Sequence, residues 1–160
     1  MDPVKGAVGA GVGVLAIGGG YGVSTLFKVP DASSLEKFLG SNSSQSSTYP
    51  NDKFGWKNKA KLIAAFDSGN QKRWEYIYDK ILKPMQTASD ATTQLNSIFQ
   101  STAVTKGYAA SSSETGAANA LNKVCDDQYK ENDPTETTKK SNIWKFCSFD
   151  GVVPATVSAG

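Results

Sequence analysis

Hydrophobic and polar positions divide this chain into an uncharged leader and a polar remainder. The leader, Gly6 to Phe27, carries no charge across 22 residues, with Lys5 before it and Lys28 after it. A helix of that length rises about 33 Å, close to the ~30 Å hydrocarbon thickness of a bilayer. We therefore predict an N-terminal transmembrane signal anchor over residues 1–28.

The flanks of the leader bear on its processing and orientation. A cleaved signal peptide has a shorter apolar core followed by a small-x-small site, and residues 24–30 contain no such site. The positive-inside rule sets Lys5 and the amino terminus against Lys28 and Lys37. We predict a single-pass protein of the plasma membrane, embedded in the lipid bilayer, with its C-terminal domain extracellular.

Glycines within the leader have a spacing that favours helix association. Gly9 and Gly13 lie four residues apart, as do Gly18 and Gly22, and small residues at that spacing let two membrane helices approach closely. This predicts a weak homo-oligomer through the transmembrane helix; the alternative is that small residues are simply frequent there. The leader has neither the dinucleotide fingerprint nor a phosphate loop.

The segment from residue 29 to residue 50 has little hydrophobic periodicity. Its centre, Ser41 to Thr48, is rich in serine and has little to bury, a composition typical of flexible tethers. We predict a flexible stalk over 29–50. Leu35, Phe38 and Leu39 leave open one amphipathic turn at the membrane surface.

After Pro50 the hydrophobic positions recur with the period of helices. They fall into five groups: Trp56, Ala60, Ile63 and Phe66; Trp74, Ile77, Tyr78, Ile81 and Leu82; Ala91, Leu95, Ile98 and Phe99; Leu121, Val124, Cys125 and Tyr129; and Ile143, Trp144 and Cys147. No segment shows strand alternation. We predict an all-α fold, with a small four- to five-helix ectodomain over 51–150 and a loose tail over 151–160.

Turn and cap signals set the predicted boundaries of these helices. The first ends at the turn signal over residues 67–70, and the second ends before Pro84, because proline disfavours a helical conformation at Lys83. The third begins near residue 89 or 90, and the fourth covers 114–130. Asp133 as cap, Pro134 at the first helical position and Glu136 three residues after the cap predict the start of the fifth.

Composition narrows the class of protein further. The net charge is only +2, and 16 of the 17 basic residues are lysine, far from the dense basic footprint of nucleic-acid binding. Lys57, Lys59 and Lys61 form the one tight basic cluster, and alternate positions do not share a helix face. We expect no nucleic-acid partner.

Cys125 and Cys147 are the only cysteines. In an extracytoplasmic domain an even pair indicates a disulfide, and closing a loop of about 23 residues is worth roughly 3.4 kcal/mol in the chain-entropy model. Two straight antiparallel helices would offset the pair by ~9 Å. Two packed thiols, or a catalytic or metal-binding thiol, therefore remain as alternatives, although the chain has no histidine to activate a thiolate.

Clustered carboxylates carry the alternative function, a membrane-tethered enzyme or accessory subunit. Its candidate groups are Asp126, Asp127, Glu131 and Asp133 near one turn, and Glu75 with Asp79 one helical turn apart. Hydrolases need two carboxylates in different environments within one cleft. A divalent cation at the acidic turn is a further alternative, although a calcium loop has a different spacing. We find no catalytic, cofactor or metal constellation, and we expect no catalysis.

Two segments carry a resemblance to a known family. The opening MDPVKGAVGAGVG with GGGYGVSTLF, and the closing element Ile143-Trp144-Lys145-Phe146-Cys147, resemble the uncharacterised paralogous proteins of haemotropic mycoplasmas. Members often carry tryptophan directly before the last cysteine, where this chain has Phe146. The resemblance implies a wall-less bacterium, and a surface protein for antigenic display or contact with a host-cell surface protein.

Overall fold

The computed structural model describes residues 29–155, and within that range the fold is helical. The described residues form seven α-helices and no β-strand, with three isolated bridges. The α-helices are α1 (Leu35–Ser41), α2 (Phe54–Lys57), α3 (Gln71–Ile77), α4 (Lys83–Thr87), α5 (Ala91–Gln94), α6 (Leu121–Tyr129) and α7 (Thr137–Cys147). A π-helix covers Tyr78–Leu82, and 3-10 turns cover Ser43–Thr48, Ser68–Asn70, Ser97–Phe99 and Ala117–Asn119.

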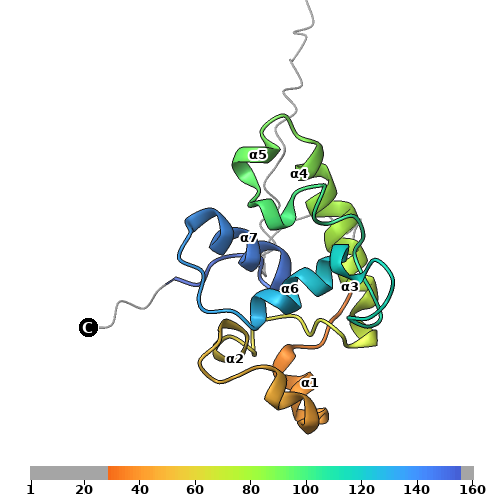
Figure 1. The fold of residues 1–160 in the computed structure, drawn as a ribbon, viewed down its shortest axis with the longest axis vertical. Helices are drawn as coiled ribbons and strands as arrows, with labels where there is room; N and C mark the ends of the chain where they lie inside the picture. The colour runs from red at the N-terminus through yellow and green to blue at the C-terminus, as the bar shows by residue number, and fades with distance from the viewer. Residues whose placement is uncertain (1–28, 156–160) are drawn as a thin grey trace, which may run out of the picture.

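The helices surround one core (Figure 1). Helices α3 and α4 follow one another along one side, α6 and α7 cross the middle, and α1 and α2 lie at the end opposite α5. Helix α6 packs against both α2 and α7. The prediction of an all-α fold is confirmed for the described residues.

Large side chains from most of the helices fill the core. Trp74 and Trp144 are buried, and Phe54 packs edge-on against Trp144 with 5.4 Å between the ring centroids, an arrangement worth about 0.5–1.5 kcal/mol beyond area burial. Trp56 differs from its predicted buried position. It is only half-buried, and the Lys59 ammonium lies 3.9 Å from its ring centroid.

The segment 29–50 differs from the predicted flexible stalk because its few apolar residues enter the core. Leu35 and Leu39, four residues apart on α1, are buried, as is Tyr49. The Leu35 amide donates to the Leu62 carbonyl at 2.8 Å, and the Ser34 hydroxyl caps the helix. The folded unit therefore begins before residue 51.

The predicted helix from Trp56 to Phe66 is wrong for most of its length. Helix α2 ends at Lys57. The chain then forms isolated β-bridges to Ser34, just before α1, and to Ser148, just after α7. The Ile63 amide donates to the Cys147 carbonyl at 3.0 Å. The Leu62 carbonyl and the Ile63 amide are satisfied by the distant residues Leu35 and Cys147, so both residues are buried although the helix has ended at Lys57.

The predicted break before Pro84 is also wrong, because a π-helical turn just before the proline lets the helix continue through it. The Lys83 amide bonds to the Tyr78 carbonyl, five residues back, and Lys83 keeps helical angles. This wider turn changes the hydrogen-bond register before Pro84, which then lies in the first turn of α4, where a missing amide hydrogen costs nothing. Helical structure consequently continues to Thr87.

Three further boundaries differ from the predictions, and in the third predicted helix Leu95 and Phe99 are buried while Ala91 and Ile98 are only partly buried. The third predicted helix breaks after Gln94, the fourth begins at Leu121, and the fifth begins at Thr137 with no side-chain cap. Asp133 pairs with Lys57 rather than capping a helix. The predicted core positions of the last two helices are confirmed: Leu121, Val124, Cys125, Tyr129, Ile143, Trp144 and Cys147.

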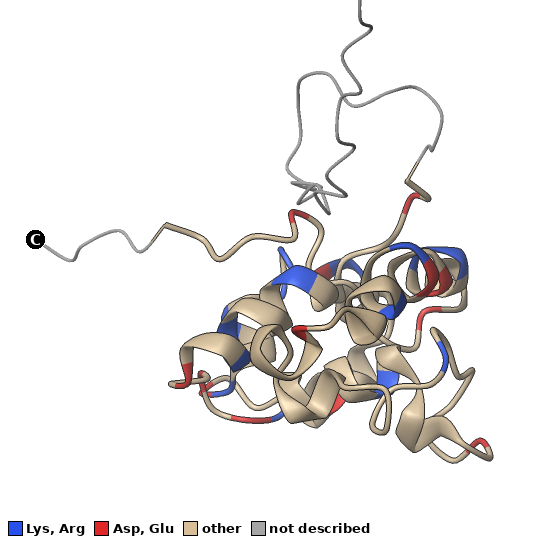
Figure 2. Ribbon diagram, turned by 90° about the horizontal axis from the view of Figure 1, so that it is seen from above, with Lys and Arg blue, Asp and Glu red and all other residues tan. Residues whose placement is uncertain are grey.

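Both ends of the described chain leave the same side of the domain (Figure 2). Basic and acidic residues are distributed around the domain rather than gathered on one face. Within 29–155 no helix has the length and hydropathy needed to cross a bilayer. The predicted anchor, with Gly9, Gly13, Gly18 and Gly22, lies outside the described residues.

Candidate functional site

A disulfide joins α6 to α7. Cys125 lies in the middle of α6 and Cys147 is the last residue of α7, with 5.6 Å between their Cα atoms. The predicted offset assumed two straight helices meeting at one turn, whereas residues 130–136 are not helical and α7 packs against α6 so that the two cysteines meet. Both cysteines are buried, so the pair is a structural staple and neither thiol is free.

Tyr129 reinforces this joint from inside the core. Its hydroxyl lies 2.9 Å from the carbonyl oxygens of both Ile63 and Cys147 and donates its proton between them. Complete burial raises the pKa of Tyr129 well above its ordinary value, and the nearby Tyr49 and Asp126 raise it further. The backbone beside the disulfide is thus held by both a covalent and a polar contact.

A second polar cluster ties the segment before α2 to α6. The Tyr49 hydroxyl donates to Asp126 at 2.5 Å, and the Lys130 ammonium donates to the other oxygen of the same carboxylate at 2.6 Å. Asp126 is fully buried, so these bonds compensate its lost hydration. Burial, followed by the charge on Asp126, raises the pKa of Tyr49.

The predicted carboxylate cluster does not converge on one cleft. Asp126 accepts hydrogen bonds from Tyr49 and Lys130. Asp127 forms an ion pair with Lys123, and Asp133 forms one with Lys57. Glu131, Glu75 and Asp79 are exposed. In residues 29–155 there is no group of three or more potential metal ligands. Each carboxylate therefore has its own surroundings, and no pair faces a shared substrate position.

Arg73 brings the two ends of the described chain together. Its guanidinium donates to the Pro30 carbonyl at 3.2 Å and to the Phe149 carbonyl at 3.1 Å. The side chain is buried, and burial lowers the pKa of Arg73. Sequence reasoning missed this role, although Arg73 is the only arginine, because neither partner is a side chain.

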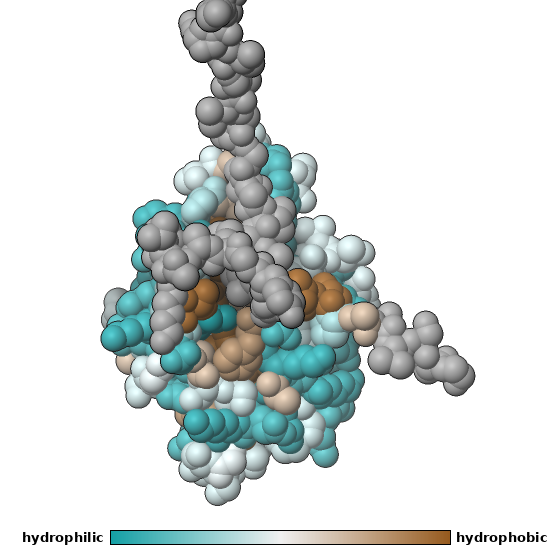
Figure 3. Space-filling view, turned by 180° about the vertical axis from the view of Figure 1, so that it is seen from behind, coloured by the Kyte–Doolittle hydropathy of each residue, from teal (hydrophilic) through white to brown (hydrophobic). Residues whose placement is uncertain are grey.

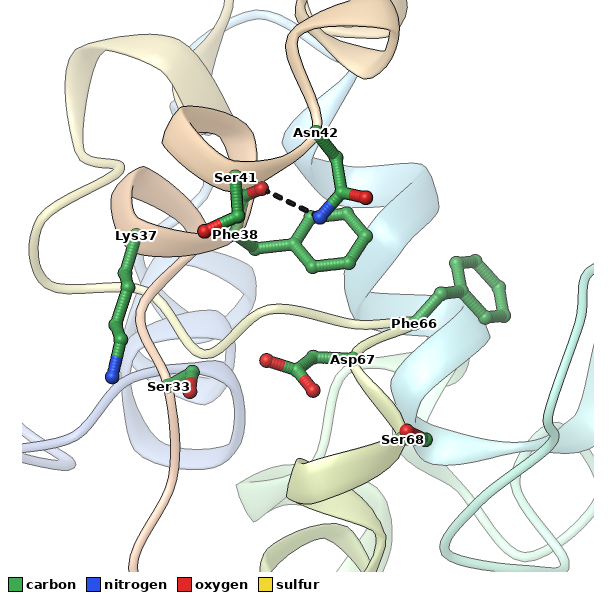
Figure 4. Close-up of a pocket in the computed structure, with 8 residues that line it drawn as sticks. All are labelled: Ser33, Lys37, Phe38, Ser41, Asn42, Phe66, Asp67 and Ser68. Atoms are coloured by element: carbon green, nitrogen blue, oxygen red, sulfur yellow. Dashed lines mark hydrogen bonds between the residues drawn. The ribbon is translucent and has the colours of Figure 1, made fainter.

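Sequence reasoning also missed the hollow between α1 and the loop that follows Phe66 (Figure 4). It encloses about 280 Å³. The Phe38 ring extends across it, and the Asp67 carboxylate points into the space between α1 and the loop. The sequence contained one indication of it, the turn at residues 67–70. That turn predicted the loop on one side of the hollow but not that α1 forms the other side. An apolar ring beside a carboxylate and the Lys37 ammonium suits a small amphipathic group.

A second shallow hollow lies beside Trp56. It encloses about 350 Å³ and is lined by Trp56, Tyr49 and Pro50, with polar side chains from Ser46, Ser47 and Asn51. Both hollows are open, and both approach the size of small-ligand pockets. Neither brings together an acid, a base and a nucleophile.

Comparison of the chain with protein-family models, with curated proteins and with solved structures gave no match.

Proposed function

We propose that this chain is a single-pass surface protein of the plasma membrane whose helical domain is displayed outside the cell and acts by binding. The observation that carries the proposal is the buried Cys125–Cys147 disulfide within the domain. Structural disulfides persist in oxidising, extracytoplasmic surroundings and are rare in the cytosol. The uncharged leader supplies the anchor in this proposal.

Binding is the proposed activity because the described surface has two hollows lined by aromatic and polar side chains, and neither hollow brings together an acid, a base and a nucleophile. The hollow beside Phe38 combines an aromatic ring with charges of both signs, and the hollow beside Trp56 combines an aromatic ring with hydroxyl and amide groups. A host-cell surface protein or antigenic display are the proposed settings. The enzyme alternative gains no support from the separated carboxylates.

Protease treatment of intact cells tests the proposed display. We expect the domain to be cleaved in intact cells, while a cytosolic marker stays protected until the cells are opened. The leader fragment should remain in the membrane pellet through an alkaline carbonate wash. A domain that stays protected while a known surface protein is cut contradicts the orientation, and a chain released by carbonate contradicts the anchor.

Thiol labelling tests the compartment independently. In protein taken directly from cells and denatured with a thiol reagent present, we expect neither Cys125 nor Cys147 to be labelled until a reductant is added. Full labelling without reductant would show a reduced pair and would remove the main support for display outside the membrane.

A further inference from the structure

The described ends of the chain are held on one side of the domain, which we call the end face: Pro30, Arg73, Phe149, Val152 and Val153. Arg73 bonds to the carbonyls of both Pro30 and Phe149. The Gly151 amide donates to the Ser148 hydroxyl at 3.1 Å, and Gly151 has a positive φ of 66°. The chain is therefore held up to the residue before Val152.

We propose that the end face lies on the bilayer and that Val152 and Val153 contact the lipid headgroup region. The inference rests on the proposed function, because it takes residues 6–27 as the membrane anchor. It adds which side of the domain meets the lipid, and it replaces a long tether with a domain seated directly on the membrane.

Chain length limits the distance between the end face and the membrane. Pro30, whose carbonyl accepts a hydrogen bond from Arg73, comes three positions after Phe27, the last residue of the uncharged leader. Three residues span at most about 10–11 Å when fully extended. An anchor that ends at Phe27 therefore keeps Pro30, and the Arg73 guanidinium bonded to its carbonyl, within about 10–15 Å of the hydrocarbon boundary. The headgroup layer is about 5–8 Å thick on each side of the bilayer, so the end face is close enough to reach it.

The side chains of the end face suit that position. Val152 and Val153 are the exposed large hydrophobic residues of the described chain, with exposed fractions of 49% and 39%. Figure 3 looks onto the side from which both ends leave, and hydrophobic side chains gather there beside the C-terminal segment. Apolar residues beside an anchor enter the headgroup boundary readily.

The charges near the end face indicate zwitterionic lipid rather than an anionic surface. Asp31 lies near enough to Arg73 to influence its pKa, and Asp150 is exposed next to Phe149. In sequence, Lys28 lies two positions before Pro30, so two positive charges, Lys28 and Arg73, stand against two carboxylates and give no net attraction for anionic headgroups. Contact with lipid should therefore persist in neutral membranes.

A lipid-quenching experiment on the full chain tests this arrangement. The protein is reconstituted in phosphatidylcholine vesicles with a fluorophore on an introduced cysteine, either Val153→Cys or the control Ala118→Cys. Ala118 is exposed, lines the same shallow hollow as Val124 and Gln128 of α6, and is not a residue of the end face. Nitroxide-headgroup lipid and aqueous iodide serve as quenchers.

The expected result is roughly twofold or greater lipid quenching at Val153 relative to Ala118, because a residue at ~5–10 Å depth meets the nitroxide. Protein that fails to float with vesicles overturns the anchor and the proposed function. Floating protein whose two probes are quenched equally by lipid overturns the end face alone. Protection of the Val153 probe from iodide without quenching by lipid would show that protein, and not lipid, covers this position, and would also overturn the end face.

Discussion

Buried amide side chains hold segments of this domain that have no regular partner. The Asn122 side chain accepts from the Ala109 amide and donates to the carbonyls of Ala109 and Ala65, all within 3.0 Å. Asn70 bonds in the same way to Ser33 and Ala64. Such residues supply backbone hydrogen bonds that a sheet or a longer helix would otherwise provide.

Arg73 offers the clearest test at the scale of a single residue. Arg73→Met keeps the apolar stem but leaves the Pro30 and Phe149 carbonyls without their donor. We expect a loss of about 2 kcal/mol in the free energy of unfolding, measured by urea denaturation. Amide exchange should rise most at Ser33 and Gly151.

Lys72→Met is the matched control, since it removes the same charge from an exposed neighbour on α3. Its effect should stay within about 0.5 kcal/mol. Equal losses in the two variants would show that general charge, and not the bond to the two carbonyls, decides stability.

Alkaline pH tests the buried tyrosines. The pKa values of Tyr49 and Tyr129 are raised in the folded domain, chiefly by burial. Both phenols stay protonated in the fold while the unfolded chain ionises above pH ~10, so stability is fully present below pH ~10 and falls as pH rises beyond it. Each tyrosine contributes a slope of about 1.4 kcal/mol per pH unit.

Tyr49→Phe should make that alkaline slope shallower by one proton, in urea midpoints followed between pH 8 and pH 11. The variant also loses its bond to Asp126 and should be less stable at neutral pH. An unchanged slope above pH 10 would mean that Tyr49 ionises normally in the fold.

At the scale of elements, the sequence pattern predicts which positions are buried better than it predicts where helices end. Trp74, Ile77 and Leu82 are buried as predicted, although the π-turn before Pro84 was not foreseen. Helical period reports a buried stripe, and the stripe survives a local change of register. Element boundaries are therefore the weaker part of the prediction.

The break in the third predicted helix depends on a contact between distant segments. The third predicted helix breaks after Gln94 because the Asn142 side chain accepts from the Asn96 amide and donates to the Gln94 carbonyl. These partners lie more than 40 residues apart in sequence, beyond any local pattern. The same holds for the hollow beside Phe38, whose two sides come from α1 and from the loop after Phe66.

Alanine substitutions at two glycines distinguish the effect of close packing between helices from the effect of helix propensity. A Cβ on Gly55 would lie 2.5 Å from Tyr129 Cβ and 2.6 Å from its carbonyl oxygen, whereas a Cβ on Gly40 meets nothing within 4 Å. Gly55→Ala should therefore push α2 away from α6 and cost about 3 kcal/mol. Thermal or urea unfolding measures the change.

Gly40→Ala should instead stabilise the domain by about 0.5–1 kcal/mol, because alanine favours the helical state of α1 over the unfolded chain. No change in stability would indicate that α1 does not unfold together with the rest of the domain. That result would be expected if the segment 29–50 were a flexible tether.

At the scale of the whole molecule, stability depends on contacts between segments far apart in sequence. The disulfide spans 22 residues, and its removal in the double variant Cys125→Ala with Cys147→Ala should cost about 3 kcal/mol. Urea midpoints of the wild type with and without reductant give the same comparison. A double variant as stable as the oxidised wild type would show that Tyr129 and the core hold the joint unaided.

The Arg73 guanidinium bonds to the carbonyls of both Pro30 and Phe149, so the first and last parts of the folded domain lie next to each other. A short Gly-Ser bridge from Asp150 to Pro30 should therefore permit circular permutation, with new termini opened in the exposed loop at Ser112 and Ser113. The permuted chain should keep the helical circular dichroism of the original and still form its disulfide, because the order of segments would change while their neighbours would not.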